Sequence, residues 1–113
     1  MKIYEQLTEL FNHFNQELFL GVLGDPVPEC IITLHRKTNT TSEMIHENFI
    51  DSKDNEKMSE IILNPQWFGI KPRIEILQYL VHQMMHVYQH TYGEVSKPGR
   101  HDEQFLDFMN AIG

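Results

Sequence analysis

Residues 77–93 read LQYLVHQMMHVYQHTYG. At about 100° per residue five apolar side chains of this stretch fall within one arc, so we predict an amphipathic helix. Pro72 can occupy its first turn, and Gly93 can close its C-terminal end. One side of this helix is expected to pack into the core. The apolar side chains of the arc are Leu77, Leu80, Val81, Met84 and Tyr88.

Two histidines stand one turn apart on the predicted helix. His82 and His86 fall at about 140° and 180° from Leu77, away from the apolar arc. Four residues of helix rise about 6 Å, which brings two ring nitrogens within reach of one ion. Neutral imidazoles at this spacing suit Zn²⁺. Because the flanking residues are strongly apolar, both histidines are expected to face a cleft.

A third metal ligand has to come from elsewhere. His101 follows the segment GEVSKPGR (93–100) and precedes another predicted helix. Three protein ligands with one open position define a catalytic zinc site. His90 competes for this role, although its offset of about 80° from His82 makes joint coordination awkward. The alternative interpretation is a metal-free helical domain with exposed histidines, and His13, His35 and His46 are interpreted as ordinary surface or strand histidines.

The remaining chain predicts a small α+β domain. Residues 1–20 show helical spacing, with Gly21 at the position of a C-terminal cap. Three strand candidates follow, at residues 30–36, 43–50 and 59–63. No helix separates them, so antiparallel pairing is expected. With a closing helix at about 102–112, the predicted architecture is an N-terminal helix, a three-stranded antiparallel sheet, the histidine-bearing helix and a C-terminal helix.

Composition excludes several classes of protein. The chain has 113 residues, 41% of them hydrophobic, which suits one domain over residues 1–113. Sixteen acidic and nine basic residues give a formal charge of −7, which disfavours nucleic-acid binding. The single cysteine, Cys30, excludes a disulfide framework and a thiolate-rich zinc site. No apolar run has membrane-spanning length and Glu5 and Glu9 interrupt any signal peptide, so we expect a cytoplasmic protein with no membrane partner.

Several separated motifs resemble those of SprT-like (Spartan-type) metallopeptidases, which are zincins. The sequence HQMMH at 82–86 is similar to HExxH with glutamine in place of glutamate. The segment GRHDEQF at 99–105 resembles the Gly-x-His-x-x-x-Phe/Trp element that carries the third ligand. FNHFNQELFLGVLGDP at 11–26 resembles the opening helix and turn, and EIILNP at 60–65 resembles the strand end before the zinc helix. The resemblance therefore extends from about residue 10 to 113.

Other zincin clans place the third ligand differently. Metzincins would have a histidine six residues after the second one, where this chain has Tyr92. A gluzincin would use a downstream glutamate, for which Glu94 or Glu103 could be proposed. The SprT-like resemblance instead implies that His101 is the third ligand.

By this resemblance, His82, His86 and His101 hold one Zn²⁺ per chain, and Gln83 stands where the family has its catalytic glutamate. The implied activity is a zinc-dependent endopeptidase acting on protein or peptide substrates, with DNA-associated proteins as a setting. The basic residues are scattered and give that setting little support of their own. Family members commonly continue past the last helix, so the chain is expected to be an excised catalytic core.

Gln83 is expected to weaken catalysis without loss of zinc. Glutamine cannot accept a proton at useful pH, although its carbonyl oxygen can accept a hydrogen bond from water. Loss of general acid–base catalysis lowers the rate by about 10²–10⁴. Three explanations stay open: an engineered replacement of glutamate, a natural pseudopeptidase that serves as a zinc-organised protein-binding module, or a chance match. Tyr88, Tyr92 and Arg100 are oxyanion-stabilising candidates by residue type only.

Overall fold

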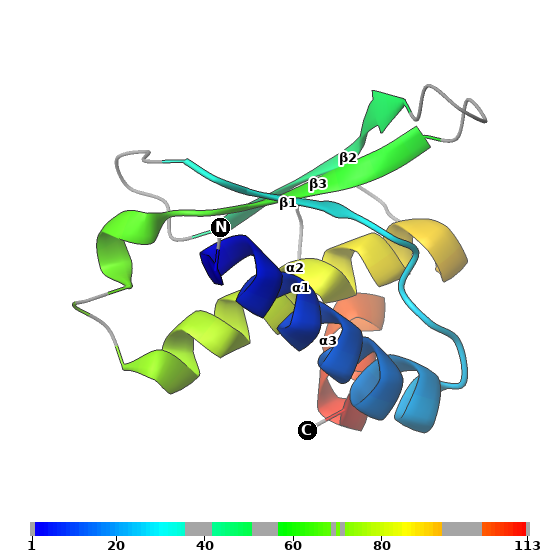
Figure 1. Ribbon diagram of the computed structural model, residues 1–113. Coiled ribbons are helices and arrows are strands. Elements are labelled where there is room, and N and C mark those ends of the chain that lie inside the picture. Colours follow the sequence, from blue (N-terminus) through cyan, green and yellow to red (C-terminus); the bar gives the residue numbers. More distant parts are fainter. Residues whose placement is uncertain are drawn as a thin grey trace.

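A computed structural model of the chain describes residues 2–35, 42–50, 57–68, 70, 72–93 and 103–112. The strands form one layer, and α1, α2 and α3 lie on one face of it (Figure 1). This arrangement confirms the predicted α+β class. The elements are α1 (Lys2–Phe14), the π-helical segment η1 (Asn15–Leu23), β1 (Ile31–Leu34), β2 (Ser42–Ile50), β3 (Lys57–Leu63), the short 3-10 helix η2 (Pro65–Trp67), α2 (Arg73–Tyr92) and α3 (Glu103–Ile112).

The sheet is mixed, so the prediction of a purely antiparallel sheet is wrong. The strand order is β1–β3–β2, in which β2 is antiparallel and β1 is parallel to the central strand β3. Leu34 and Ser42 both pair with Leu63, so β1 ends and β2 begins at the same end of β3. Parallel strands need a return path between them, which is usually a helix. Here β2 carries the chain back, so no helix is required.

The N-terminal helix is longer than predicted and ends at a different glycine. It continues from α1 through η1 to Leu23, so Gly21 lies inside it and is not its C-terminal cap. The cap is Gly24, whose φ of 92° lies in the left-handed region that favours glycine. Its N–H donates to the carbonyl oxygens of Phe19 (3.0 Å) and Leu20 (3.2 Å). The wider π-type turns of η1 were not visible in the helical spacing.

The turn after Gly24 is held from two directions. The side-chain amide of Asn15 donates to the carbonyl of Val27 at 2.8 Å, and its oxygen accepts from the Val27 N–H at 2.6 Å. From the other direction, the Tyr92 hydroxyl donates to the carbonyl of Pro26 at 2.6 Å. These bonds tie the connector before β1 to the N-terminal helix and to the last turn of α2.

The helix α2 matches its predicted bounds. Pro72 caps its start, where its carbonyl accepts from the Glu75 N–H at 3.0 Å, and the Gly93 N–H donates to the Gln89 carbonyl at 2.8 Å at its end. None of the helices in the described ranges is long and apolar enough to cross a membrane.

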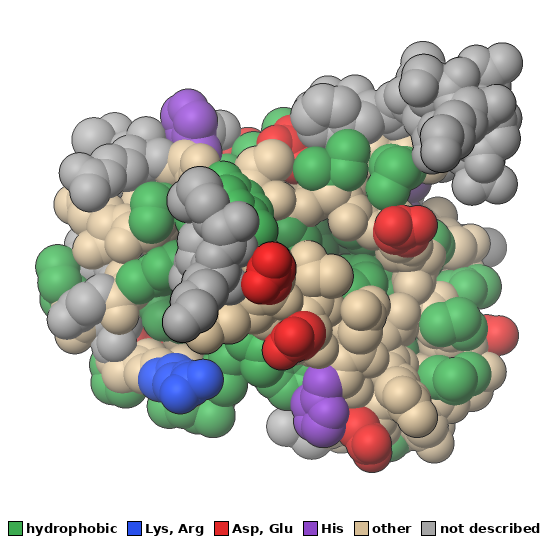
Figure 2. Space-filling model, in the orientation of Figure 1, with side chains coloured by type: hydrophobic (Ala, Val, Ile, Leu, Met, Phe, Trp, Pro, Cys, Tyr) green, Lys and Arg blue, Asp and Glu red, His purple; other side chains and the backbone are tan. Residues whose placement is uncertain are grey.

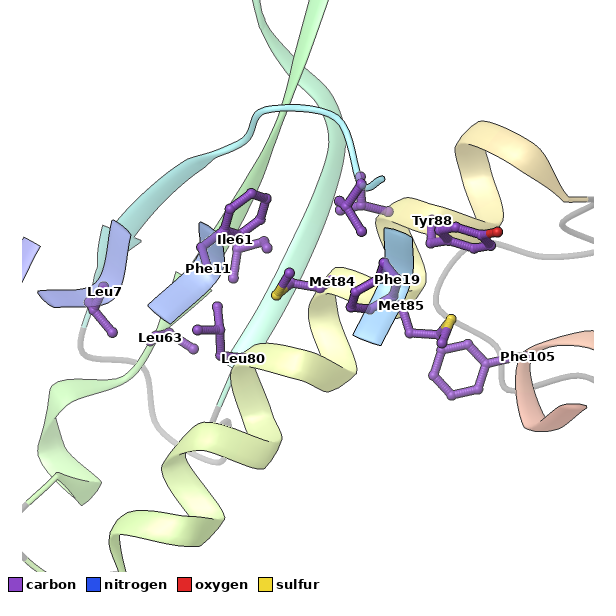
Figure 3. Packing of buried hydrophobic residues seen from close by; sticks show 12 residues of the cluster. Leu7, Phe11, Phe19, Ile61, Leu63, Leu80, Met84, Met85, Tyr88 and Phe105 are labelled. Atoms are coloured by element: carbon purple, nitrogen blue, oxygen red, sulfur yellow. The ribbon is translucent and has the colours of Figure 1, made fainter. Parts of the chain in front are cut away.

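The hydrophobic core lies between the sheet and the helices, and α2 runs through it. Figure 3 shows Leu80 and Met84 of α2 near Ile61 and Leu63 of β3, and all four side chains are buried. Burial of each such side chain contributes about 1.5–3 kcal/mol relative to exposure. α2 is therefore held against the sheet through Leu80 and Met84, while His82 and His86 contact Phe105 of α3. The buried core cluster comprises Leu7, Phe11, Phe19, Val27, Ile61, Leu63, Leu80, Met84, Met85, Val87, Tyr88 and Phe105.

Candidate metal centre

His82 and His86 lie next to each other on α2. Their ring centroids are 4.9 Å apart, and the ring planes make an angle of 79°. His86 is buried with 6% of its surface exposed, and His82 is half-buried. The pair does not lie on an open solvated face, and its burial agrees with the expectation that the histidines are enclosed.

Phe105 of α3 covers both imidazoles. Its ring stacks on His86 with a centroid distance of 4.4 Å and an angle of 25°. It meets His82 edge to face at 5.2 Å and 67°. Phe105 is itself only 2% exposed, so both histidine rings have a buried aromatic neighbour from another helix. The motif GRHDEQF ends at Phe105, but the sequence did not predict this contact.

Polar groups at the C-terminal end of α2 contact the start of α3. The Gln89 side chain is 1% exposed, and its amide donates to the side-chain oxygen of Gln104 at 3.1 Å. A side chain at Gly93 would overlap the same Gln104 amide. The Gln89–Gln104 hydrogen bond thus joins the start of α3 to the end of α2, next to Gly93.

Gln83 faces the start of β2. It is buried, with 7% of its surface exposed, and its Nε2 donates to Oγ of Ser42 at 2.8 Å. Ser42 is held in place by its pairing with Leu63 in the sheet. This hydrogen bond sets the orientation of the Gln83 amide, because Nε2 points to Ser42 and Oε1 points away from it.

A second histidine contact joins α2 to the sheet. His90 stacks on His46 of β2, with ring centroids 4.2 Å apart and an angle of 22°. Nδ1 of His46 also lies 3.5 Å from Oγ of Ser59 on β3. From the sequence His46 is interpreted as an ordinary surface or strand histidine, and this contact is not predicted. The two histidines are 44 positions apart in the chain, and no spacing rule links them.

Several residues proposed from the sequence lie outside the described residues, namely His101, Arg100 and Glu94. Glu103, the other glutamate considered as a ligand, is exposed at the start of α3. Within the described ranges no group of three or more His, Cys, Asp or Glu side chains is placed to hold a metal ion. The described donors are two adjacent imidazoles, which fit zinc in type and in spacing, and a catalytic zinc site would need one more protein ligand.

The tyrosines considered as oxyanion donors have other roles. Tyr88 is 4% exposed and packs against Phe19 and Phe108, with centroid distances of 5.6 and 5.3 Å. Burial raises the pKa of its phenol above the ordinary value. The Tyr92 hydroxyl is bonded to Pro26, as described above. Tyr88 is thus a core residue, and the hydroxyl of Tyr92 serves the connector before β1.

Cys30 lines a different cavity, next to α1 and the start of β1, and neither His82 nor His86 belongs to the lining of that cavity. It belongs to the chain segment just before β1, and burial, with a contribution from the neighbouring Glu29 carboxylate, raises its pKa to about 12. The thiolate is the form that binds metals. The neutral thiol is therefore the stable form at ordinary pH.

A cavity of about 760 Å³ lies beside His82 and Gln83. It is bounded by α1 and η1, by the N-terminal half of α2, by α3 and by the start of β2. Among its described lining residues, most are apolar. The half-buried His82 therefore borders the same cavity as side chains of α1, η1 and α3.

Comparison with known protein families shows a match over nearly the whole chain. The sequence model of the SprT-like family matches residues 7–113. The matched range includes α2 with His82, Gln83 and His86, and it also includes His101 and Phe105. A search of curated proteins gave no significant match.

Proposed function

This chain belongs to the SprT-like family, which indicates a zincin-type metallopeptidase domain, and on that premise we propose that it is a zinc endopeptidase core whose turnover is limited by Gln83. The observation that carries the proposal is the pair His82 and His86, adjacent on α2 and covered by Phe105. Neutral imidazoles held in this way are suited to bind a divalent cation. The proposed substrate is a protein or peptide, and the proposed stoichiometry is one Zn²⁺ per chain.

We propose His101 as the third ligand. It precedes Phe105 by four residues, and four residues of extended chain span at most about 14 Å. In the motif that GRHDEQF resembles, the metal ligand stands four positions before the aromatic residue, which in this chain is Phe105, the residue that contacts both imidazoles. His90 is the less suitable choice, since its ring is stacked on His46.

Bound zinc would supply a Lewis acid that lowers the pKa of a coordinated water molecule. The contribution of Gln83 follows from its hydrogen bond to Ser42, which uses Nε2 and leaves Oε1 as an acceptor. Oε1 can orient a water molecule through a hydrogen bond, but it cannot take up a proton. The proposed consequence is a loss of about 10²–10⁴ in rate, or roughly 3–5 kcal/mol of barrier.

A second candidate function is a zinc-organised module that binds a protein segment without cutting it. The observation that favours it is the burial of Gln83 and its bond to Ser42, because glutamine is well accommodated at this position. In this case the cavity beside His82 would hold its partner without turnover. The metal ligands would be the same in both proposals.

A DNA-associated setting is an expectation from the family resemblance alone. Of the nine Lys and Arg residues, only Lys57 and Arg73 have side chains among those the structure describes. On the face seen in Figure 2, the basic colour is confined to one small area and acidic side chains appear at several places. We therefore propose a polypeptide substrate and assign no nucleic-acid surface.

Gln83→Glu, assayed for cleavage of an unfolded protein such as casein with zinc present, tests the proposal. We expect cleavage to rise by about 10²–10⁴ over the unchanged chain, because a carboxylate restores proton transfer. The matched control is Gln6→Glu, which adds the same charge at an exposed position of α1 outside the lining of the cavity and should leave cleavage unchanged. No gain in the Gln83→Glu variant, with zinc still bound, would favour the binding module.

A further inference from the structure

We propose, building on the proposed function, that the cavity beside His82 and Gln83 receives an apolar side chain of the polypeptide substrate. His82 and Gln83 both belong to its lining, so any occupant lies against the residues assigned to the reaction. The cavity would therefore select the kind of side chain that stands next to the cleaved bond.

The apolar part of the cavity is formed by side chains of α1, η1, α2 and α3. Its volume of about 760 Å³ is in the range of pockets that hold ligands, about 300–1,000 Å³. The helices α1, η1, α2 and α3 were brought together by the core described above, and the cavity is the space that they leave beside α2. The apolar lining side chains are Phe14, Leu18, Ile74, Leu77, Val81, Met109 and Ile112.

The lack of charged residues in the described lining disfavours the binding of acidic and basic side chains in this cavity. Among the described lining residues there is no Asp, Glu, Lys or Arg. A charged side chain that enters an apolar cavity without a partner loses its hydration and gains no ion pair. The formal charge of −7 on the chain adds repulsion against acidic segments.

The polar part of the lining favours a polypeptide over a purely hydrocarbon ligand. Ser42, Gln78 and Gln83 offer a hydroxyl and two amides on the same cavity that the apolar residues line. An extended peptide has backbone N–H and C=O groups next to its side chain, and both kinds of group need partners. A hydrocarbon ligand would offer no hydrogen bonds to these polar side chains of the cavity.

Peptide binding to the zinc-loaded chain tests this proposal. The probes are fluorescein-labelled short peptides of Gly, Ser and Asn that differ in one central residue, which is Leu, Phe or Asp. We expect the Leu and Phe peptides to bind about 10- to 100-fold more tightly than the Asp peptide, the effect of burying one large apolar side chain. Fluorescence anisotropy gives the affinities.

A pair of isoleucines provides the matched variants. Ile74 lines the cavity and is 62% exposed, whereas Ile70 is 71% exposed and is not part of the lining. Ile74→Glu places a charge at the cavity and should remove the preference for Leu and Phe. Ile70→Glu makes the same exchange and should preserve it. Because both positions are exposed, both variants are expected to fold, which the midpoint of urea unfolding verifies.

The outcomes separate this proposal from the proposed function, because zinc content is measured on the same samples. Zinc-loaded chain with equal affinity for the three peptides, or with no binding to any of them, overturns the pocket and leaves the metal site intact. If the chain retains no zinc after incubation with it but still binds the Leu and Phe peptides more tightly than the Asp peptide, the pocket is supported and the metal site is overturned. A dimer in analytical ultracentrifugation that Ile74→Glu dissociates would also overturn the pocket, since a second copy of the chain would then occupy the cavity.

Discussion

The two histidine pairs of α2 differ in geometry and in surroundings. His82 and His86 come from the same helix, and their ring planes cross at 79° beneath Phe105. His90 and His46 come from a helix and a strand, and their ring planes are nearly parallel at 22°. Both pairs have similar centroid separations, 4.9 and 4.2 Å, so proximity alone does not distinguish them.

The orientation of the rings decides which pair is suited to hold a metal. A ring nitrogen binds an ion with its in-plane lone pair, so the ion lies near the plane of each imidazole that holds it. The planes of His82 and His86 cross close to the rings, and one ion can lie in both. The planes of His46 and His90 run almost side by side, and their stacking instead packs β2 against α2. Histidine content is thus a poor guide to metal binding unless ring orientation is known.

The largest expected effect concerns Phe105, which packs on His82 and His86. Phe105→Ala removes a buried ring that contacts both His82 and His86, and we expect a loss of about 3–5 kcal/mol in the free energy of unfolding. Urea unfolding in the presence of EDTA measures it without a contribution from zinc. The control is Leu106→Ala, the neighbouring residue on α3, which is 52% exposed and should change the stability much less. Equal effects of the two variants would contradict the role given to Phe105.

Zinc affinity should separate the two pairs. His86→Ala is expected to weaken zinc binding by more than about 100-fold, because loss of an outer-shell partner alone already weakens binding by 10–100-fold. His46→Ala is the matched control from the stacked pair and should leave the affinity nearly unchanged. Competition with a chromophoric chelator gives both values on untagged protein. The comparison between the pairs would fail if His46→Ala weakened binding as much as His86→Ala.

The smallest expected effect comes from the stacked pair. His46→Ala removes the ring contact with His90 and the polar contact with Ser59, and we expect a loss of about 0.5–1.5 kcal/mol in the free energy of unfolding. Thermal or urea unfolding of the metal-free protein measures it. His13→Ala, an exposed position on α1, provides the baseline. A His46→Ala variant as stable as His13→Ala would mean that the stack does not hold β2 against α2.

Local features were predicted well because their causes are close together in the chain. Pro72 and Gly93 delimit α2 within one turn of its ends, and the i, i+4 spacing alone places His82 beside His86. Gln83, between the two histidines, is likewise placed on α2 by this spacing. What could not be foreseen was its partner, Ser42, which lies 41 positions earlier in the chain.

Pairings between distant segments were predicted poorly. The parallel pairing of β1 with β3 depends on which side of β3 each neighbouring strand takes, and the apolar content of the strands does not encode this choice. The end of the N-terminal helix was misplaced because Gly21 and Gly24 are both suitable caps by residue type, and only the backbone shows a positive φ at Gly24. The contacts of Phe105 and His46 were not predicted for the same reason, since each joins two elements that are distant in the chain.

Anomalous X-ray scattering at the zinc edge, from crystals of untagged chain grown with zinc, tests the central claim most directly. The account predicts one strong peak per chain, within bonding distance of a ring nitrogen of His82, of His86 and of His101. A peak held by His46 and His90, or a zinc ion bound by His82 and His86 with the His101 ring out of reach, would contradict it.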